Sequence, residues 1–228
     1  MHFIKYNPGR ERLYANLVRE LETGTELIKS ENIDTMFQGA IINGYISAEL
    51  LQEQLFPSTQ AKVFISHSSA DAAVALMLKA KLQEEGISAF VDSEVWENVY
   101  EILERYQFPE GVTKIPAEEG NDKSKQLFLM LAGALCKTIY QSACFVYVVP
   151  STKELEDGKV LSTSPWLAHE LGIAEMIYIM QQPREKSAAM VNESIANMPL
   201  LHDVSAPFIE EMEKSCDKVV NFIKEKVK

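Results

Sequence analysis

A short tract in the second half of the chain combines an aromatic ring with a carboxylate. It reads Ser164-Pro165-Trp166-Leu167-Ala168-His169-Glu170-Leu171-Gly172. Ser164 is suited to capping the start of a helix, and Pro165 to its first position, where no N–H partner is needed. Trp166 and Glu170 then share one helix face. A carboxylate beside an aromatic surface is suited to holding a flat cationic ring and the sugar attached to it.

A second polar tract lies upstream and follows an apolar run. Lys62-Val63-Phe64-Ile65 has no polar alternation, as expected of a parallel strand buried on both faces, and Ser66-His67-Ser68-Ser69-Ala70-Asp71 comes next. Ligands of open parallel sheets bind beyond the carboxyl ends of the strands. Ser66, His67 and Ser68 are therefore candidates for binding a ribose or a phosphate. The same serines, with Asp71, are also typical of helix caps.

The order of the next elements predicts an α/β fold. A helix with Ala75, Leu78 and Leu82 on one face is expected to stop at Gly86, and a strand at 87–91 ends at Asp92. This βαβ unit predicts a parallel sheet with right-handed crossovers. Asp92 is a further candidate ligand-binding residue, or else a turn former.

The remaining elements are expected as follows. Helices are predicted over 94–108 and 125–140, a loop over 115–121 and a third strand over 144–149. Residues 177–180 either continue the helix of the Trp166 tract or begin a fourth strand. A closing helix is marked by Phe208, Met212, Val219 and Ile223.

Residues 1–58 are predicted to be a helical N-terminal extension. Leucines and a valine recur there at helical spacing (Leu13, Leu17, Val18 and Leu21), and 35–55 is apolar over much of its surface. Residues 61–228 are predicted to form the α/β domain. The extension could cap the sheet, hold the protein inactive or build a dimer.

Composition excludes several classes of function. The chain has 228 residues, of which 46% are hydrophobic, and a net charge of −11, which repels nucleic acid and anionic membrane surfaces. Three cysteines are too few for a disulfide framework and have no metal-ligand spacing, so no metal site is expected. With no apolar signal region and no run of about 18 apolar residues, the expected location is a reducing cytoplasm.

The two polar tracts, in this order and with strands between them, resemble a Toll/interleukin-1 receptor (TIR) domain of the prokaryotic branch. The resemblance rests on Val63 to Asp71, on the strand ending at Asp92, on the strand at 145–149 and on Ser164-x-Trp166-x-x-x-Glu170-Leu171-Gly172. It covers about residues 61–180. It implies a flavodoxin-like parallel sheet flanked by helices.

For many bacterial members the resemblance also implies cleavage of NAD at the bond between nicotinamide and ribose. That reaction passes through an oxocarbenium-like state, as other glycosyl transfers do. Glu170 matches the position of the catalytic glutamate, and Ser66, His67, Ser68, Asp92 and Trp166 are the expected NAD-binding residues. NAD would be the substrate, with no permanently bound cofactor. Thoeris-type relatives act in antiphage defence by producing a nucleotide signal, which implies an effector that senses the product. The resemblance also implies homo-oligomers, because TIR enzymes commonly self-associate to complete the site.

Two features depart from the family pattern. The Ser66–Asp71 turn has no arginine, where family members often have one, so His67 is its only candidate for positive charge. After Asp92 the chain has Glu94-Val95-Trp96-Glu97 and a long helical insertion in place of a glycine-bearing loop. Trp96 is a candidate for a lid over the site.

Two other functions are consistent with the same residues. A non-enzymatic TIR-like adaptor would assemble through its helices and inserted loop. Whatever the function, Trp166 could be a packing residue and Glu170 a solvated side chain, and His169 is expected at the surface. A nucleoside deoxyribosyltransferase-like enzyme would also set a glutamate beside a sugar on a related sheet.

Overall fold

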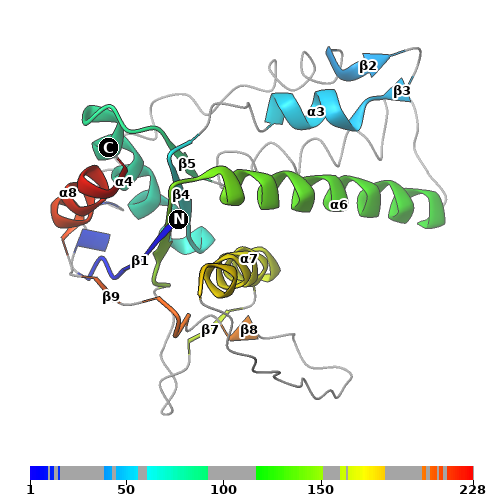
Figure 1. Ribbon diagram of the computed structural model, residues 1–228. Coiled ribbons are helices and arrows are strands. Elements are labelled where there is room, and N and C mark those ends of the chain that lie inside the picture. The colour runs from blue at the N-terminus through cyan, green and yellow to red at the C-terminus, as the bar shows by residue number, and fades with distance from the viewer. Residues whose placement is uncertain are drawn as a thin grey trace.

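The computed structural model describes residues 1–9, 11–12, 15, 39–42, 45–55, 61–91, 117–150, 160–162, 164–182, 202–203, 206–209, 211–212 and 215–227. Their strands and helices form an open α/β structure with one central sheet (Figure 1). Among the described helices, none has the length and apolar character needed to cross a bilayer.

The central sheet is parallel, and its order is β5-β4-β6-β1-β9. The predicted strands correspond to β4 (Val63–Ser66), β5 (Ala89–Val91) and β6 (Cys144–Val148). The helix α4 (Ala72–Glu84) connects β4 to β5 and completes the predicted βαβ unit. The predicted fold class, a parallel sheet flanked by helices, is confirmed.

The prediction that residues 1–58 are helical is wrong at the N-terminus. β1 (His2–Tyr6) lies inside the sheet, where it pairs with β6 and with β9 (Glu211–Met212). Five residues are too few for their periodicity to indicate a strand, and pairing on both sides determines the conformation. Ile4 and Tyr6 are fully buried in one core cluster, and Phe3 packs against the other. β1 thus belongs to the sheet that was predicted to lie within 61–228.

The rest of the predicted extension is only partly described. β2 (Ile41–Ile42) and β3 (Tyr45–Ile46) form an antiparallel pair, so the prediction of a helix is wrong there as well. α3 (Ala48–Leu55) is helical as expected. Leu13, Leu17, Val18 and Leu21 lie outside the described residues, as does the helix predicted over 94–108.

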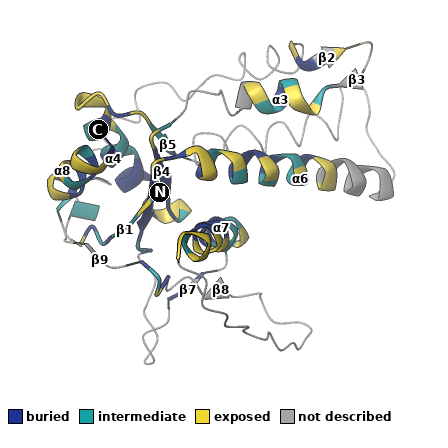
Figure 2. Cartoon of the chain, viewed as in Figure 1, coloured by how far each residue is buried: buried dark blue, intermediate teal, exposed yellow. Residues whose placement is uncertain are grey.

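Two helical layers cover the sheet, because successive side chains of a strand point to opposite faces. Val63 and Ile65 belong to the core beneath α4 and α8 (Cys216–Val227), whereas Phe64 belongs to the core beneath α6 (Ala117–Gln141) and α7 (Pro165–Gln181). Figure 1 shows α4 and α8 on one side of the sheet and α6 and α7 on the other. In Figure 2 the strands are buried between helices whose outer faces are exposed.

A row of aromatic rings crosses the face beneath α6 and α7. Phe90, Phe64 and Phe145 come from three adjacent strands, with ring centroids 5.5 and 5.7 Å apart, and Phe3 continues the row 6.4 Å from Phe145. Phe64 and Phe145 are register partners and stack almost parallel. Stacked aromatic pairs add to the burial energy, so this row joins four strands into one layer.

Helix boundaries differ from the predictions in three places. α6 begins at Ala117, so 117–121 is helical rather than a loop, in keeping with the helix-forming Ala117-Glu118-Glu119 sequence at its start. Residues 177–180 continue α7, which decides between the two alternatives. The closing helix α8 begins only at Cys216, and Met212, which was expected to mark that helix, lies in β9. The small antiparallel pair of β7 (Leu161–Ser162) and β8 (His202–Asp203) lies outside the central sheet.

Gly86 ends α4, as predicted, through a Schellman motif. The Gly86 N–H donates to the Gln83 carbonyl and the Ile87 N–H to the Leu82 carbonyl, both at 2.9 Å. Gly86 has φ +71°, in the left-handed region that a side chain disfavours. Glycine is therefore required here for conformational reasons.

Gly86→Ala is expected to lower the free energy of unfolding by about 1–2 kcal/mol, the cost of a left-handed L-residue. Gly172→Ala, inside α7, is the matched control, since an added Cβ meets nothing within 4 Å at either site. Because alanine favours a helix interior, the control should raise that free energy by roughly 0.5–1 kcal/mol. Urea denaturation measures both changes, and equal effects of the two substitutions would contradict this account.

Candidate functional site

The N-terminus of α7 is formed as its sequence predicts. Ser164 is the N-cap, its hydroxyl accepts a hydrogen bond from the Leu167 N–H at 3.2 Å, and Pro165 follows at the first helical position. The Ser164 N–H donates to the Ser162 hydroxyl at 3.0 Å, which fixes the entry into the helix. The helix that carries Trp166 and Glu170 therefore begins at a defined residue.

Glu170 lies on the inner face of α7 and has no solvent exposure. Its neighbours along that face are apolar: Leu167, Leu171, Ala174 and Ile177 are all buried in the core between α6, α7 and the sheet. The Ser66 hydroxyl, also fully buried, donates a hydrogen bond of 2.5 Å to Glu170 Oε2. The alternative that Glu170 is an ordinary solvated side chain is therefore wrong.

Strand register explains why Ser66 reaches Glu170. Ser66 is two residues beyond Phe64 in β4, so both side chains point toward α6 and α7. Its register partner Tyr147 is likewise buried in that core. At the carboxyl end of β4, Ser66 thus places a hydroxyl on the same face as Phe64, in contact with the Glu170 carboxylate of α7.

Trp166 is half-buried between the two helices of this layer. Its ring lies 5.7 Å from that of Phe128 on α6, and the His169 ring meets it edge-on at 6.3 Å. The alternative that Trp166 is a packing residue agrees with these contacts. His169 is half-buried rather than a surface residue, and its Nε2 is buried without a hydrogen-bond partner among the described residues.

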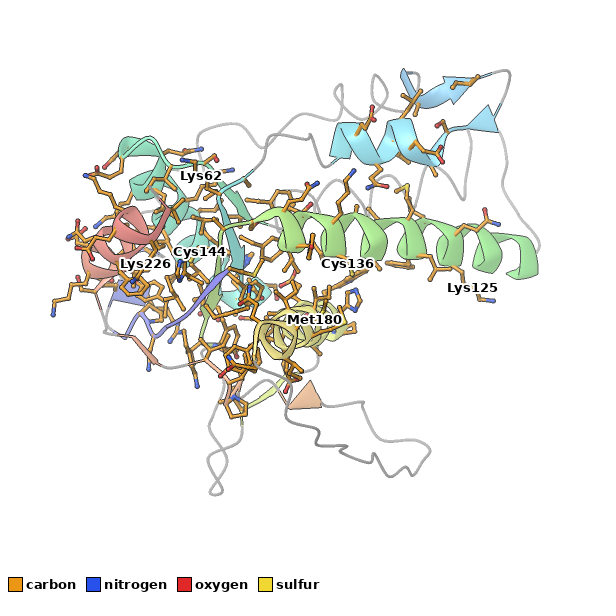
Figure 3. All side chains as sticks on the ribbon, in the orientation of Figure 1. Lys62, Lys125, Cys136, Cys144, Met180 and Lys226 are labelled. Carbon is orange, nitrogen blue, oxygen red and sulfur yellow. The ribbon has the colours of Figure 1, made fainter. Side chains whose placement is uncertain are left out.

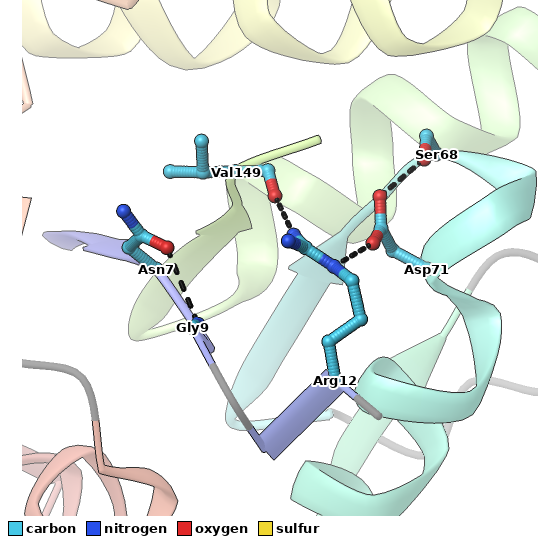
Figure 4. A network of polar contacts seen from close by, with 6 residues as sticks. All are labelled: Asn7, Gly9, Arg12, Ser68, Asp71 and Val149. Carbon is cyan, nitrogen blue, oxygen red and sulfur yellow. Dashed lines mark hydrogen bonds and ion pairs between the residues drawn. The ribbon is translucent and has the colours of Figure 1, made fainter. Parts of the chain in front are cut away.

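The turn after β4 is held by an ion pair that no feature of the sequence indicated. Asp71, fully buried, accepts a hydrogen bond of 2.5 Å from the Ser68 hydroxyl, and Arg12 Nε lies 2.6 Å from its Oδ1 (Figure 4). Neither Ser68 nor Asp71 caps the following helix with its side chain, so the capping alternative is wrong for these two residues. His67, which is 5% exposed, lies between Ser66 and Ser68 in the chain.

Arg12 supplies to this turn the arginine that the turn itself lacks. It comes from the segment after β1, 59 residues before Asp71, and its Nη2 also donates to the Val149 carbonyl at 2.6 Å. No local pattern could have indicated this contact, because Arg12 and Asp71 are far apart in the chain. Residues 1–58 were also expected to be a separate helical extension. With its charge matched by a buried carboxylate, Arg12 adds little net positive charge for a phosphate.

Two of the predicted site residues, Asp92 and Trp96, lie outside the described residues. The structure thus brings together Ser66 and Glu170, and it places His67 and Ser68 on the adjacent turn. Within the described part of the chain, no group of three His, Cys, Asp or Glu side chains could hold a metal ion.

This arrangement could serve chemistry that needs one oriented carboxylate. Ser66 fixes Oε2, and the rigid helix and strand on either side restrict its movement. In this conformation neither side chain is accessible to solvent. A substrate would therefore reach Glu170 only after part of the surrounding structure moved.

Comparisons of the chain with family models, with curated proteins and with solved structures find no significant match. The parallel α/β fold and the geometry around Glu170 therefore stand on the sequence and structure of this chain alone.

The cysteines are not placed as nucleophiles. Cys144 in β6 and Cys216 at the start of α8 are fully buried, and Cys136 on α6 is half-buried; Figure 3 labels Cys136 and Cys144 on their elements. Burial raises the pKa of Cys144 to about 12 and that of Cys216 to about 11. At neutral pH both are therefore thiols, the unreactive form.

Iodoacetamide at pH 8 is expected to leave Cys144 and Cys216 unmodified in the folded protein and to modify both in urea, as peptide mass spectrometry would show. The pKa of both thiols is raised in the folded protein, so they ionise more easily in the unfolded chain. The free energy of unfolding is therefore expected to fall as pH rises from about 9 toward 11. Rapid modification of Cys144 without urea would contradict its placement in the core.

Proposed function

We propose that this protein is a TIR-type NAD glycohydrolase or cyclase with Glu170 as its catalytic carboxylate. The observation that carries the proposal is the hydrogen bond from Ser66 to Glu170. It joins the two tracts that resemble TIR domains, which are 104 residues apart in the chain. It also lies at the carboxyl end of β4, the edge at which open parallel sheets bind ligands.

The proposed reaction needs few groups from the protein. Nicotinamide leaves from an already cationic pyridinium, so no acid has to protonate it. An ionised Glu170 would stabilise the positive charge that develops on the ribose as the bond breaks. Water then yields ADP-ribose, or an internal nucleophile of the ADP-ribosyl group yields a cyclic isomer.

Burial of Glu170 sets a condition on this proposal. The substrate must gain access to a carboxylate that has no exposed surface in the described conformation. A ribose hydroxyl can take over the hydrogen bond that Ser66 donates, so the carboxylate would keep a donor as NAD enters. Self-association is a reasonable trigger for such an opening, and activity per molecule should then rise with protein concentration.

The biological setting proposed with this activity is antiphage defence, in which a downstream effector senses the ADP-ribose-derived product. NAD is the only small molecule that the proposal requires, and no bound cofactor is needed. The intracellular supply of NAD is consistent with a cytoplasmic protein.

A non-enzymatic adaptor is the second candidate, and a surface feature favours it. Met176, Ile179 and Met180 follow one another at helical spacing on the outer face of α7 and are 54%, 61% and 73% exposed. An apolar helix face of this kind suits contact with another protein. In an adaptor, the Ser66–Glu170 pair would serve only to hold α7 against the sheet.

Glu170→Gln is expected to lower the rate of nicotinamide release from NAD by about a hundred- to a thousandfold, the usual effect of removing one preorganised electrostatic group. The amide keeps the size of the side chain and can still accept from Ser66. Chromatography of NAD incubated with each protein, over a range of protein concentrations, measures the rate and identifies the product.

Glu175→Gln provides the matched control, since Glu175 is an exposed carboxylate on the same helix. It should leave the rate within about twofold, as a surface substitution does. If the wild-type protein releases no nicotinamide at any concentration, the adaptor is favoured. Base exchange between deoxynucleosides, with NAD left intact, would instead indicate a deoxyribosyltransferase-like enzyme.

A further inference from the structure

Arg12 joins the carboxyl ends of three adjacent strands. It follows β1, it binds Asp71 in the short helical turn after β4, and it donates to the carbonyl of Val149 just after β6. The guanidinium makes both contacts at 2.6 Å, through Nε and Nη2 (Figure 4). A planar fork with fixed donors holds two acceptors in one geometry, which an ammonium group cannot do.

The segment that carries Arg12 is held in place by its neighbour, Glu11. Glu11 accepts two hydrogen bonds on Oε2, from the Tyr6 hydroxyl at 2.6 Å and from the Cys216 N–H at 2.8 Å. These contacts tie the segment to the end of β1 and to the first turn of α8, where a carboxylate is favourable. Arg12 therefore extends from a rigid base toward the turn after β4.

The turn that Arg12 holds also contains the donor to Glu170. Ser66 is the last residue of β4, and Asp71 closes the turn, with its N–H donating to the Ser68 carbonyl at 2.8 Å and its carboxylate accepting from the Ser68 hydroxyl. Asp71 is fully buried, whereas the side chain of Arg12 is 20% exposed. Loss of Arg12 would take a charged partner away from a buried carboxylate, so the turn is expected to rearrange.

We infer that Arg12 is a positioning residue: by holding Asp71 and Val149, it fixes the turn from Ser66 to Asp71 and through it the orientation of Ser66 against Glu170. Arg12 does not contact the reacting atoms. Its effect on catalysis rests on the proposed NAD cleavage, but its effect on the turn does not. The first strand and the segment after it thus become part of the site.

Amide hydrogen exchange of the 66–71 segment tests the effect on the turn. Arg12→Lys keeps the charge but loses the fork, and Arg12→Met with Asp71→Asn removes both charges without leaving a buried ion unpaired. Exchange in the segment is expected to rise in both variants, while melting curves confirm that they are folded. Exchange unchanged in both variants would overturn the inference, whatever the activity.

Steady-state kinetics with NAD test the link to Glu170. For both variants kcat should fall on the order of 10- to 100-fold, with KM changed much less, because a misplaced Ser66 disturbs the reacting geometry. Lys81→Ala is the control: it removes the ion pair of Lys81 with Asp217, whose side chains are 35% and 72% exposed, and kcat should stay within about twofold.

The outcomes of the two experiments are distinguishable. A looser turn with an unchanged kcat would overturn the link between Arg12 and Glu170. A wild-type protein that does not cleave NAD, combined with a looser turn in the variants, would defeat the proposed function and still support Arg12 as the residue that holds the turn.

Discussion

A carboxyl group buried in an apolar layer constrains this structure more than any other single feature. Burying a polar group costs free energy unless it gains hydrogen bonds, and for a charged group the cost is larger. α7 presents Glu170 amid Leu167, Leu171 and Ala174, and the β4 residue facing it is Ser66, whose hydroxyl donates to it. Any slip of α7 along the sheet would break this contact, so the pair also fixes the position of the helix.

The two sides of the sheet have different compositions, and the side that contains Ser66 and Glu170 is the aromatic one. Beneath α4 and α8 the core is largely aliphatic, with Val63, Ile65 and their neighbours. Beneath α6 and α7 a row of phenylalanines crosses the strands, and Ser66 lies two residues beyond the Phe64 of that row in β4. Large flat rings keep this layer dry and rigid, and a polar pair within it is consequently well fixed.

Local patterns predicted what local forces determine. The unbroken apolar run of β4, the cap at Ser164 and the glycine after α4 each act over a few residues, and each is found where the sequence indicated. Ser66 and Glu170 were each named from their tracts, as separate candidates. Their direct contact, and the burial of Glu170, depend on strand register and could not be read from spacing.

The errors have a common physical origin in long-range pairing. The His2–Tyr6 segment is too short to distinguish a strand from a helix by period, and only its pairing with β6 and β9 decides. Arg12 escaped notice for the same reason: its partners Asp71 and Val149 are distant in the chain. The burial of Cys144, by contrast, follows from local sequence, because a strand with apolar residues on both faces has no exposed side.

The central claim is that Ser66 and Glu170 interact directly and support one another. A double-mutant cycle with Ser66→Ala and Glu170→Met, each of which removes the hydrogen bond, measured as the free energy of unfolding in urea, tests it most directly. The contact predicts that the effects of the two substitutions are not additive, with a coupling energy of at least about 1 kcal/mol, as found for residues in direct contact. Effects that add to within about 0.5 kcal/mol would contradict it, because independent sites behave in that way.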